Sequence, residues 1–152
     1  MYSYCLDDPI NWVDPYGLKI VYKDKKAREA VDRLRSRSTT ADDIAKNLEK
    51  STETITIELT SGGNAYTPCT NTVSFNPSKT HIYSGSKAWH NRPPEVGLAH
   101  ELIHAEHDIL GTLGSTRMDE EKKTVGLGKY TSNPHTENKI RSEYGIPLRP
   151  IY

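Results

Sequence analysis

Two histidines and a glutamate occupy one turn of a predicted helix in the segment GLAHELIHAEHDILG, residues 97–111. His100 and His104 are four residues apart, so both imidazoles project from the same helix face and can reach one tetrahedral ion at about 2.0 Å. Two neutral nitrogen donors suit zinc, which lowers the pKa of a bound water to about 7. Glu101 can take a proton from that water and later pass it to a leaving amine. The spacing therefore predicts a zinc site in which Glu101 is a base and not a ligand.

A catalytic zinc requires a third protein ligand and an open fourth position. The candidates for that ligand are the downstream carboxylates: Asp119, Glu120, Glu121, Glu137 and Glu143. His107 lies two turns from His100, so we expect it to support a ligand or to lie on the surface. Two alternatives stay open here. Histidines at this spacing also occur as ordinary helix residues. Glu120 and Glu121 are also typical of a solvent-exposed acidic run that is balanced by the two lysines after it.

The helix that carries these residues has a continuous apolar stripe. Its members follow one another at steps of three or four residues: Leu98, Leu102, Ala105 and Ile109. Pro93 and Pro94 after Asn91 are typical of a helix start, and Gly111 with Gly114 is typical of a helix end. The pattern predicts one long helix between these signals.

The hydrophobic periodicity of the other segments indicates both strands and helices. Ile55 and Ile57 alternate with polar residues as in a strand, whereas Ala27, Val31 and Leu34 have helical spacing. The expected elements are strands over 19–24, 54–60, 71–77 and 80–86, a loop over 61–68, helices over 25–37, 39–50, 117–125 and about 134–144, and an extended tail over 145–152. This order predicts the α+β class.

Charge and cysteine content exclude several classes of protein. The 152 residues carry 20 basic and 20 acidic side chains, so no net charge is available to neutralise a phosphate backbone or an anionic membrane. Cys5 and Cys69 lie far apart, which disfavours both a disulfide framework and a cysteine metal site. There is neither a signal-peptide pattern nor a long apolar run. We therefore expect no nucleic-acid partner, no membrane span and no export signal.

The region around the histidines resembles a known family of peptidases. HELIHAEHDILG, followed by DEEKKTVGL and ENKIR, is similar to the zinc proteases of the NleD-like effector family and, more distantly, to the clostridial neurotoxin light chains. The resemblance implies a zincin-like metallopeptidase with a small mixed sheet and a central HExxH helix. Matching Thr124 and Gly126 implies that Glu121 is the third zinc ligand. Glu120 is then expected to orient a ligating histidine, and Glu137 is the alternative ligand.

The same resemblance implies a role for two residues near the C-terminus. Arg141 and Tyr144 share a helix face, and the light chains have an Arg-x-x-Tyr pair near the scissile carbonyl. These side chains are therefore expected to stabilise the oxyanion of the transition state. The alternative is that Arg141 pairs with Glu137, while Asn138 ties this helix to the site. The substrate strand is expected along an exposed sheet edge, residues 80–84.

The first eighteen residues resemble a different family. They are similar to the end of the core of Rhs (YD-repeat) proteins, and the matching residues are Tyr2, Tyr4, Asp8, Pro9, Asn11, Asp14, Pro15, Gly17 and Leu18. The resemblance implies that 1–18 is a remnant of the Rhs core and that 19–152 is the toxin domain. Its release motif is formed by Asp14, Pro15, Gly17 and Leu18. The alternative is a simple loop rich in Gly and Pro.

Together these patterns predict a zinc-dependent endopeptidase, with Zn²⁺ as cofactor, that acts as an Rhs toxin. The Rhs resemblance implies delivery without a signal peptide by a secretion system, such as type VI, into the cytoplasm of a target cell. It also implies three partners: a protein substrate in that cell, a cognate immunity protein and the Rhs shell of the parent chain. The alternatives are a zinc-stabilised toxin module that acts by binding, and a zinc hydrolase with a non-protein substrate.

Overall fold

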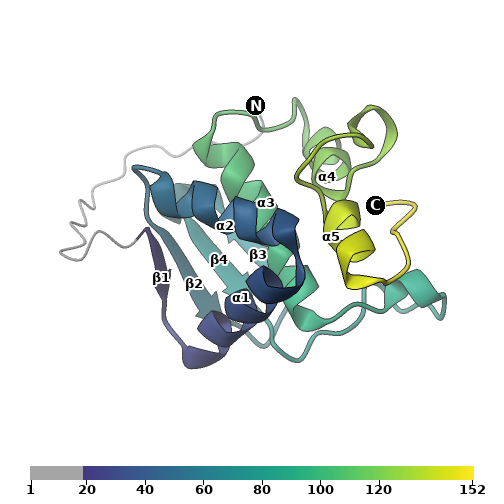
Figure 1. The fold of residues 1–152 in the computed structure, drawn as a ribbon, viewed down its shortest axis with the longest axis horizontal. Helices are drawn as coiled ribbons and strands as arrows, with labels where there is room; N and C mark the ends of the chain where they lie inside the picture. Colours follow the sequence, from purple (N-terminus) through teal and green to yellow (C-terminus); the bar gives the residue numbers. More distant parts are fainter. Residues whose placement is uncertain (1–18) are drawn as a thin grey trace.

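Alternating apolar residues build a small sheet with one buried face. A computed structural model of the chain describes residues 19–152 and contains the strands β1 (Ile20–Tyr22), β2 (Ile55–Leu59), β3 (Ala65–Thr67) and β4 (Thr72–Phe75) (Figure 1). Their order is β1-β2-β4-β3, with β3 antiparallel to β4 and the other pairs parallel. Together with five α-helices, this mixed sheet confirms the α+β prediction. The predicted Rhs remnant, 1–18, lies outside the described residues.

Two helices, α1 (Lys25–Arg37) and α2 (Thr39–Lys50), connect the parallel strands β1 and β2. Ser38 ends α1 and caps α2, because its hydroxyl accepts a hydrogen bond from the backbone N–H of Ala41 at 2.9 Å. The Glu143 carboxylate accepts the Ser38 hydroxyl at 2.6 Å, which ties this junction to the C-terminal helix.

The predicted histidine helix is α3 (Pro94–Ile109), which begins with a proline at its first position. Every residue from Glu95 to His107 is buried, and not only the apolar stripe. One side of α3 packs against α1, α2, β3 and β4, and the other packs against α4 (Arg117–Val125) and α5 (Glu137–Tyr144). The three histidines of α3 are therefore enclosed between α3 and the two C-terminal helices, whose glutamates they contact.

The two C-terminal helices begin and end with recognisable caps. The hydroxyls of Thr116 and Thr136 accept hydrogen bonds from the first turns of α4 and α5, and both helices end at a glycine in the left-handed conformation. Three short 3₁₀ turns complete the connections: Pro68–Thr70, Ala88–His90 and Gly128–Tyr130.

The structure corrects the prediction for the sheet edge. Residues 80–84 form no strand of the sheet and make only an isolated bridge between His81 and Asn91. The sheet has β1 at one edge and β3 at the other, and β3 lies in a segment that was expected to be a loop. Ala65–Thr67 has no apolar alternation, and antiparallel pairing with β4 makes it a strand.

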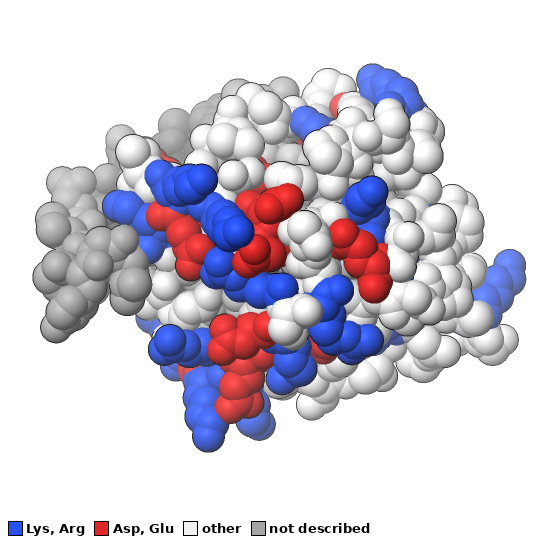
Figure 2. Space-filling model, in the orientation of Figure 1, with Lys and Arg blue, Asp and Glu red and all other residues white. Residues whose placement is uncertain are grey.

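The surface over α1 and α2 carries interspersed acidic and basic side chains, with no broad patch of one sign on this face (Figure 2). Arg35, for example, pairs with Asp42 at 2.7 Å and with Glu49 at 2.9 Å. Among residues 19–152, no helix is both long and apolar enough to cross a membrane.

Candidate metal centre

Three side chains from two helices meet at one point. His100 and His104 of α3 bring their Nε2 atoms to 3.2 Å from each other, and Oε2 of Glu121 on α4 lies 3.0 Å and 3.2 Å from these nitrogens. Ligands that hold one tetrahedral ion at about 2.0 Å are about 3.3 Å from one another. The separations of the three atoms therefore match a metal site, and within the described residues only this trio forms such a group of histidines and carboxylates.

A carboxylate holds the other nitrogen of each histidine. Nδ1 of His100 lies 2.8 Å from Oε1 of Glu137, and Nδ1 of His104 lies 2.6 Å from Oε2 of Glu120. An ionised carboxylate only accepts hydrogen bonds, so each Nδ1 carries a hydrogen, and each imidazole in its neutral, metal-binding form presents its lone pair at Nε2. Two lone pairs and a carboxylate oxygen thus converge, which is the donor set that zinc prefers. The residues present fit the ion.

The electrostatics of the cluster favour positive charge at its centre. Burial lowers the pKa of His104, but its hydrogen bonds to Glu120 and Glu121 outweigh burial and raise this pKa to about 10. Burial raises the pKa of Glu121, yet the bonds from His100 and His104 hold that pKa well below its usual range. Because ligands bind a metal in their deprotonated forms, a proton and a metal ion compete for this position.

Glu120 links the cluster to the start of α4. Its carboxylate accepts from Nδ1 of His107 at 2.8 Å, from the Thr124 hydroxyl at 3.0 Å and from the backbone N–H of Gly114 at 2.8 Å. Burial raises the pKa of Glu120, but the bonds from the two histidines lower it to about 2. His107 therefore contacts the carboxylate behind His104 and does not reach the Nε2 side. The Glu120 carboxylate lies at Nδ1 of His104, on the opposite side of the imidazole from Nε2.

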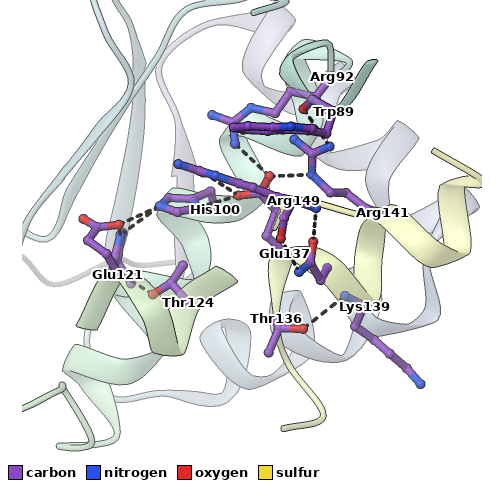
Figure 3. A network of polar contacts seen from close by, with 12 residues as sticks. Trp89, Arg92, His100, Glu121, Thr124, Thr136, Glu137, Lys139, Arg141 and Arg149 are labelled. Atoms are coloured by element: carbon purple, nitrogen blue, oxygen red, sulfur yellow. Dashed lines mark hydrogen bonds and ion pairs between the residues drawn. The ribbon is translucent and has the colours of Figure 1, made fainter. Parts of the chain in front are cut away.

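Glu137 is fully buried and is held by three arginines. Arg141 contacts Oε2 at 2.7 Å, Arg92 contacts the same oxygen at 3.0 Å, and Arg149 contacts Oε1 at 3.1 Å. Figure 3 shows His100 between Glu121 on one side and Glu137 with its arginines on the other. Glu137 thus lies at the nitrogen that faces away from the converging atoms. This position disagrees with its expected role as the alternative ligand.

Glu101 lies beside the cluster but is not part of it. Its side chain is buried, and its charge contributes to the raised pKa of His104. Within residues 19–152, no hydrogen bond or ion pair engages its carboxylate. The remaining two candidates lie elsewhere: Asp119 accepts from Ser115, and Glu143 accepts from Ser38.

The structure does not bring Arg141 and Tyr144 to the cluster, contrary to expectation. The Arg141 side chain is fully buried and donates to Glu137 and to the carbonyl oxygens of Trp89 and Pro147. The Tyr144 hydroxyl donates to Glu95 at 3.2 Å, at the start of α3. Arg141 and Tyr144 are held by interior partners, because the face of α5 that carries them points toward the core and not toward the Nε2 atoms of the histidines.

Three residues at the centre have no motif that reveals them in the sequence. Arg92 precedes α3, while Arg149 and Tyr152 belong to the predicted extended tail. The Tyr152 ring lies nearly parallel to the His100 ring, with centroids 6.4 Å apart. Burial raises the pKa of Tyr152, and the negative charge of the nearby Glu121 carboxylate raises it further. The folding of the tail onto α5 and His100 places Arg149 and Tyr152 here, and the start of α3 places Arg92.

The chain matches one family of known proteins. No curated protein and no solved structure matches the chain significantly. A family model, Peptidase M91, described as an effector protein, matches residues 22–152. That range includes the whole candidate centre and nearly the whole described fold, so the chain belongs to the Peptidase M91 family of effector proteins.

Proposed function

We propose that this chain is a zinc-dependent endopeptidase of the zincin type that cleaves proteins inside a target cell. One observation carries the proposal. Two histidine nitrogens and one glutamate oxygen converge at 3.0–3.2 Å, while separate carboxylates hold the outer nitrogen of each histidine. A structural zinc usually has four protein ligands, whereas three leave a position open for reaction. The ligand count therefore favours catalysis over a zinc-stabilised binding module.

His100, His104 and Glu121 would hold the ion, and zinc, when bound, supplies a Lewis acid and an activated water. Glu101 takes the proton from water as the water oxygen adds to the peptide carbonyl carbon. Glu101 then gives that proton to the amide nitrogen as the carbon–nitrogen bond breaks. Its carboxylate suits this role because no other group of residues 19–152 engages it. Glu137 and Glu120 keep both imidazoles in the tautomer that directs a lone pair inward.

The edge strand β3 is the proposed docking strand for the substrate. It ends the sheet, so one of its edges has no partner strand among the described residues, and it packs against α3. An extended peptide can pair with such an edge through backbone hydrogen bonds. This placement replaces the expected docking along residues 80–84.

The proposed biological context is that of an Rhs toxin. The family match begins at Tyr22, just beyond the predicted release motif, which supports a domain boundary near Lys19. Membership of an effector family supports delivery into a target cell. A cognate immunity protein that covers the candidate metal centre is the expected partner.

Substitution of the proposed base tests the function directly. We expect Glu101→Gln to bind zinc as tightly as wild type and to lose cleavage and toxicity, because a neutral amide cannot accept the water proton. Glu29→Gln, on the exposed face of α1, is the matched control and should stay active. Proteomics of cells that express each variant would identify new protein termini. Equal sets of new termini for Glu101→Gln and wild type would refute the proposal.

A further inference from the structure

The last residues of the chain fold over the candidate centre. The Tyr152 and His100 rings are 11° from parallel with their centroids 6.4 Å apart, and the Glu121 carboxylate lies near enough to raise the pKa of the Tyr152 hydroxyl. Tyr152 is still 37% exposed, so it also faces solvent. A phenol thus lies between two of the three proposed ligands and the outside of the molecule.

Arg149 holds Tyr152 in this place. The Arg149 side chain is 3% exposed, its Nε donates to the carbonyl oxygen of Ile151 at 3.0 Å, and its guanidinium lies 4.9 Å from the Tyr152 ring centroid. Arg149 also bonds Glu137, and its backbone N–H and carbonyl oxygen pair with the Asn138 amide at 2.7 Å and 2.9 Å. The tail is therefore built into the network that orients His100.

Peptide hydrolysis needs a hydrogen-bond donor for the carbonyl oxygen as that oxygen becomes anionic. Arg141 and Tyr144 are not available, because Glu137 and Glu95 occupy their polar groups. Thr124 donates to Glu120. Tyr152 lies partly exposed beside His100 and Glu121, and at neutral pH its phenol is a donor.

We propose that Tyr152 is a catalytic residue whose hydroxyl donates a hydrogen bond to the carbonyl oxygen of the scissile peptide, an inference that rests on the proposed function. The water oxygen bonds to the carbonyl carbon, the π electron pair moves to the carbonyl oxygen, and the water proton goes to Glu101. Tyr152 stabilises the resulting oxyanion and keeps its own proton. When the carbon–nitrogen bond breaks, the electron pair returns to re-form the carbonyl, and Glu101 protonates the amine.

Tyr152→Phe removes only the hydroxyl and keeps the ring on His100. The matched control is Tyr22→Phe on β1, at the opposite end of the sheet from β3. With a peptide that spans a cleavage site found by proteomics, we expect kcat of Tyr152→Phe to fall by about 10²-fold with little change in KM. Affinity for zinc alone should stay within about threefold of wild type, whereas binding of a phosphinic peptide with a tetrahedral oxyanion should weaken about as much as kcat.

The possible results separate the role of Tyr152 from the proposed peptidase function. If Tyr152→Phe keeps the wild-type kcat and the wild-type affinity for the phosphinic peptide, the role of Tyr152 is refuted while the peptidase stands. If zinc affinity falls together with kcat, Tyr152 supports the ligands and is not a catalytic residue. If the wild-type protein cleaves nothing and behaves like Glu101→Gln, the proposed function fails, and the role of Tyr152 fails with it.

Discussion

Each proposed histidine ligand is oriented by a carboxylate with other partners of its own. Glu120 accepts hydrogen bonds from two histidines, a threonine and a backbone amide, and Glu137 contacts three arginines as well as His100. These contacts leave neither carboxylate free to rotate. The geometry of the two imidazoles therefore depends on charges behind the rings as well as on the i, i+4 spacing.

Loss of the Glu120 charge should weaken metal binding without changing any ligand. In Glu120→Gln, an amide oxygen in the place of Oε2 leaves the amide N–H₂ facing the N–H of Gly114, and the flipped amide directs an N–H at Nδ1 of His104 and favours the wrong tautomer. We expect zinc affinity to fall about 10–100-fold, measured by competition with a chromophoric chelator. Asp119→Asn is the control, because Asp119 is adjacent but accepts from Ser115 and Tyr130. Equal affinities for the two variants would contradict this role.

The centre depends on how three helices meet. α3 supplies two proposed ligands, α4 supplies Glu121, and α5 supplies the carboxylate behind His100. The junction of α4 and α5 is tight at Gly126, whose φ is 93° and where an added Cβ would lie 2.9 Å from the Thr136 side chain. Thr136 caps α5, so this contact sets the position of α5 against α4.

Gly126→Ala should therefore destabilise the fold more than a comparable change in open space. Gly111→Ala is the matched control, because φ there is 70° and nothing lies within 4 Å of an added Cβ. Both variants should lose about 1–2 kcal/mol from backbone strain. Crowding against Thr136 should cost Gly126→Ala about 1–3 kcal/mol more. Urea denaturation measures the free energy of unfolding of both variants. If both lose the same amount, the α4–α5 contact adjusts to the added methyl group without destabilising the fold.

At the scale of the whole molecule, the site couples the two halves of the fold. Residues 19–109 form the sheet with α1–α3, and the later helices and tail close over the polar side of α3. Because the proposed ligands come from both halves, zinc would bind the folded protein in preference to the unfolded chain. Metal binding then adds to the free energy of unfolding.

Zinc at 100 times its Kd should stabilise the wild-type protein by about 2.7 kcal/mol. For a protein of this size, that corresponds to a rise in Tm of roughly 5–10 °C. A chelator should reverse the rise, and Glu121→Gln should lose most of it, whereas Glu29→Gln should keep it. Calorimetry with and without zinc measures these values. A Glu121→Gln protein that zinc stabilises as fully as wild type would exclude Glu121 as a ligand.

Local patterns in the sequence predicted most of the elements, the α+β class and the convergence of His100 with His104. Those features depend on residues only three or four positions apart, where helix geometry fixes relative positions. Resemblance to a family pointed to Glu121. The tertiary structure alone decided that β3 is an edge strand, that Arg141 and Tyr144 face the interior, and that Tyr152 lies beside His100. These outcomes depend on contacts between segments far apart in the chain, and no local periodicity encodes which partner a side chain meets there.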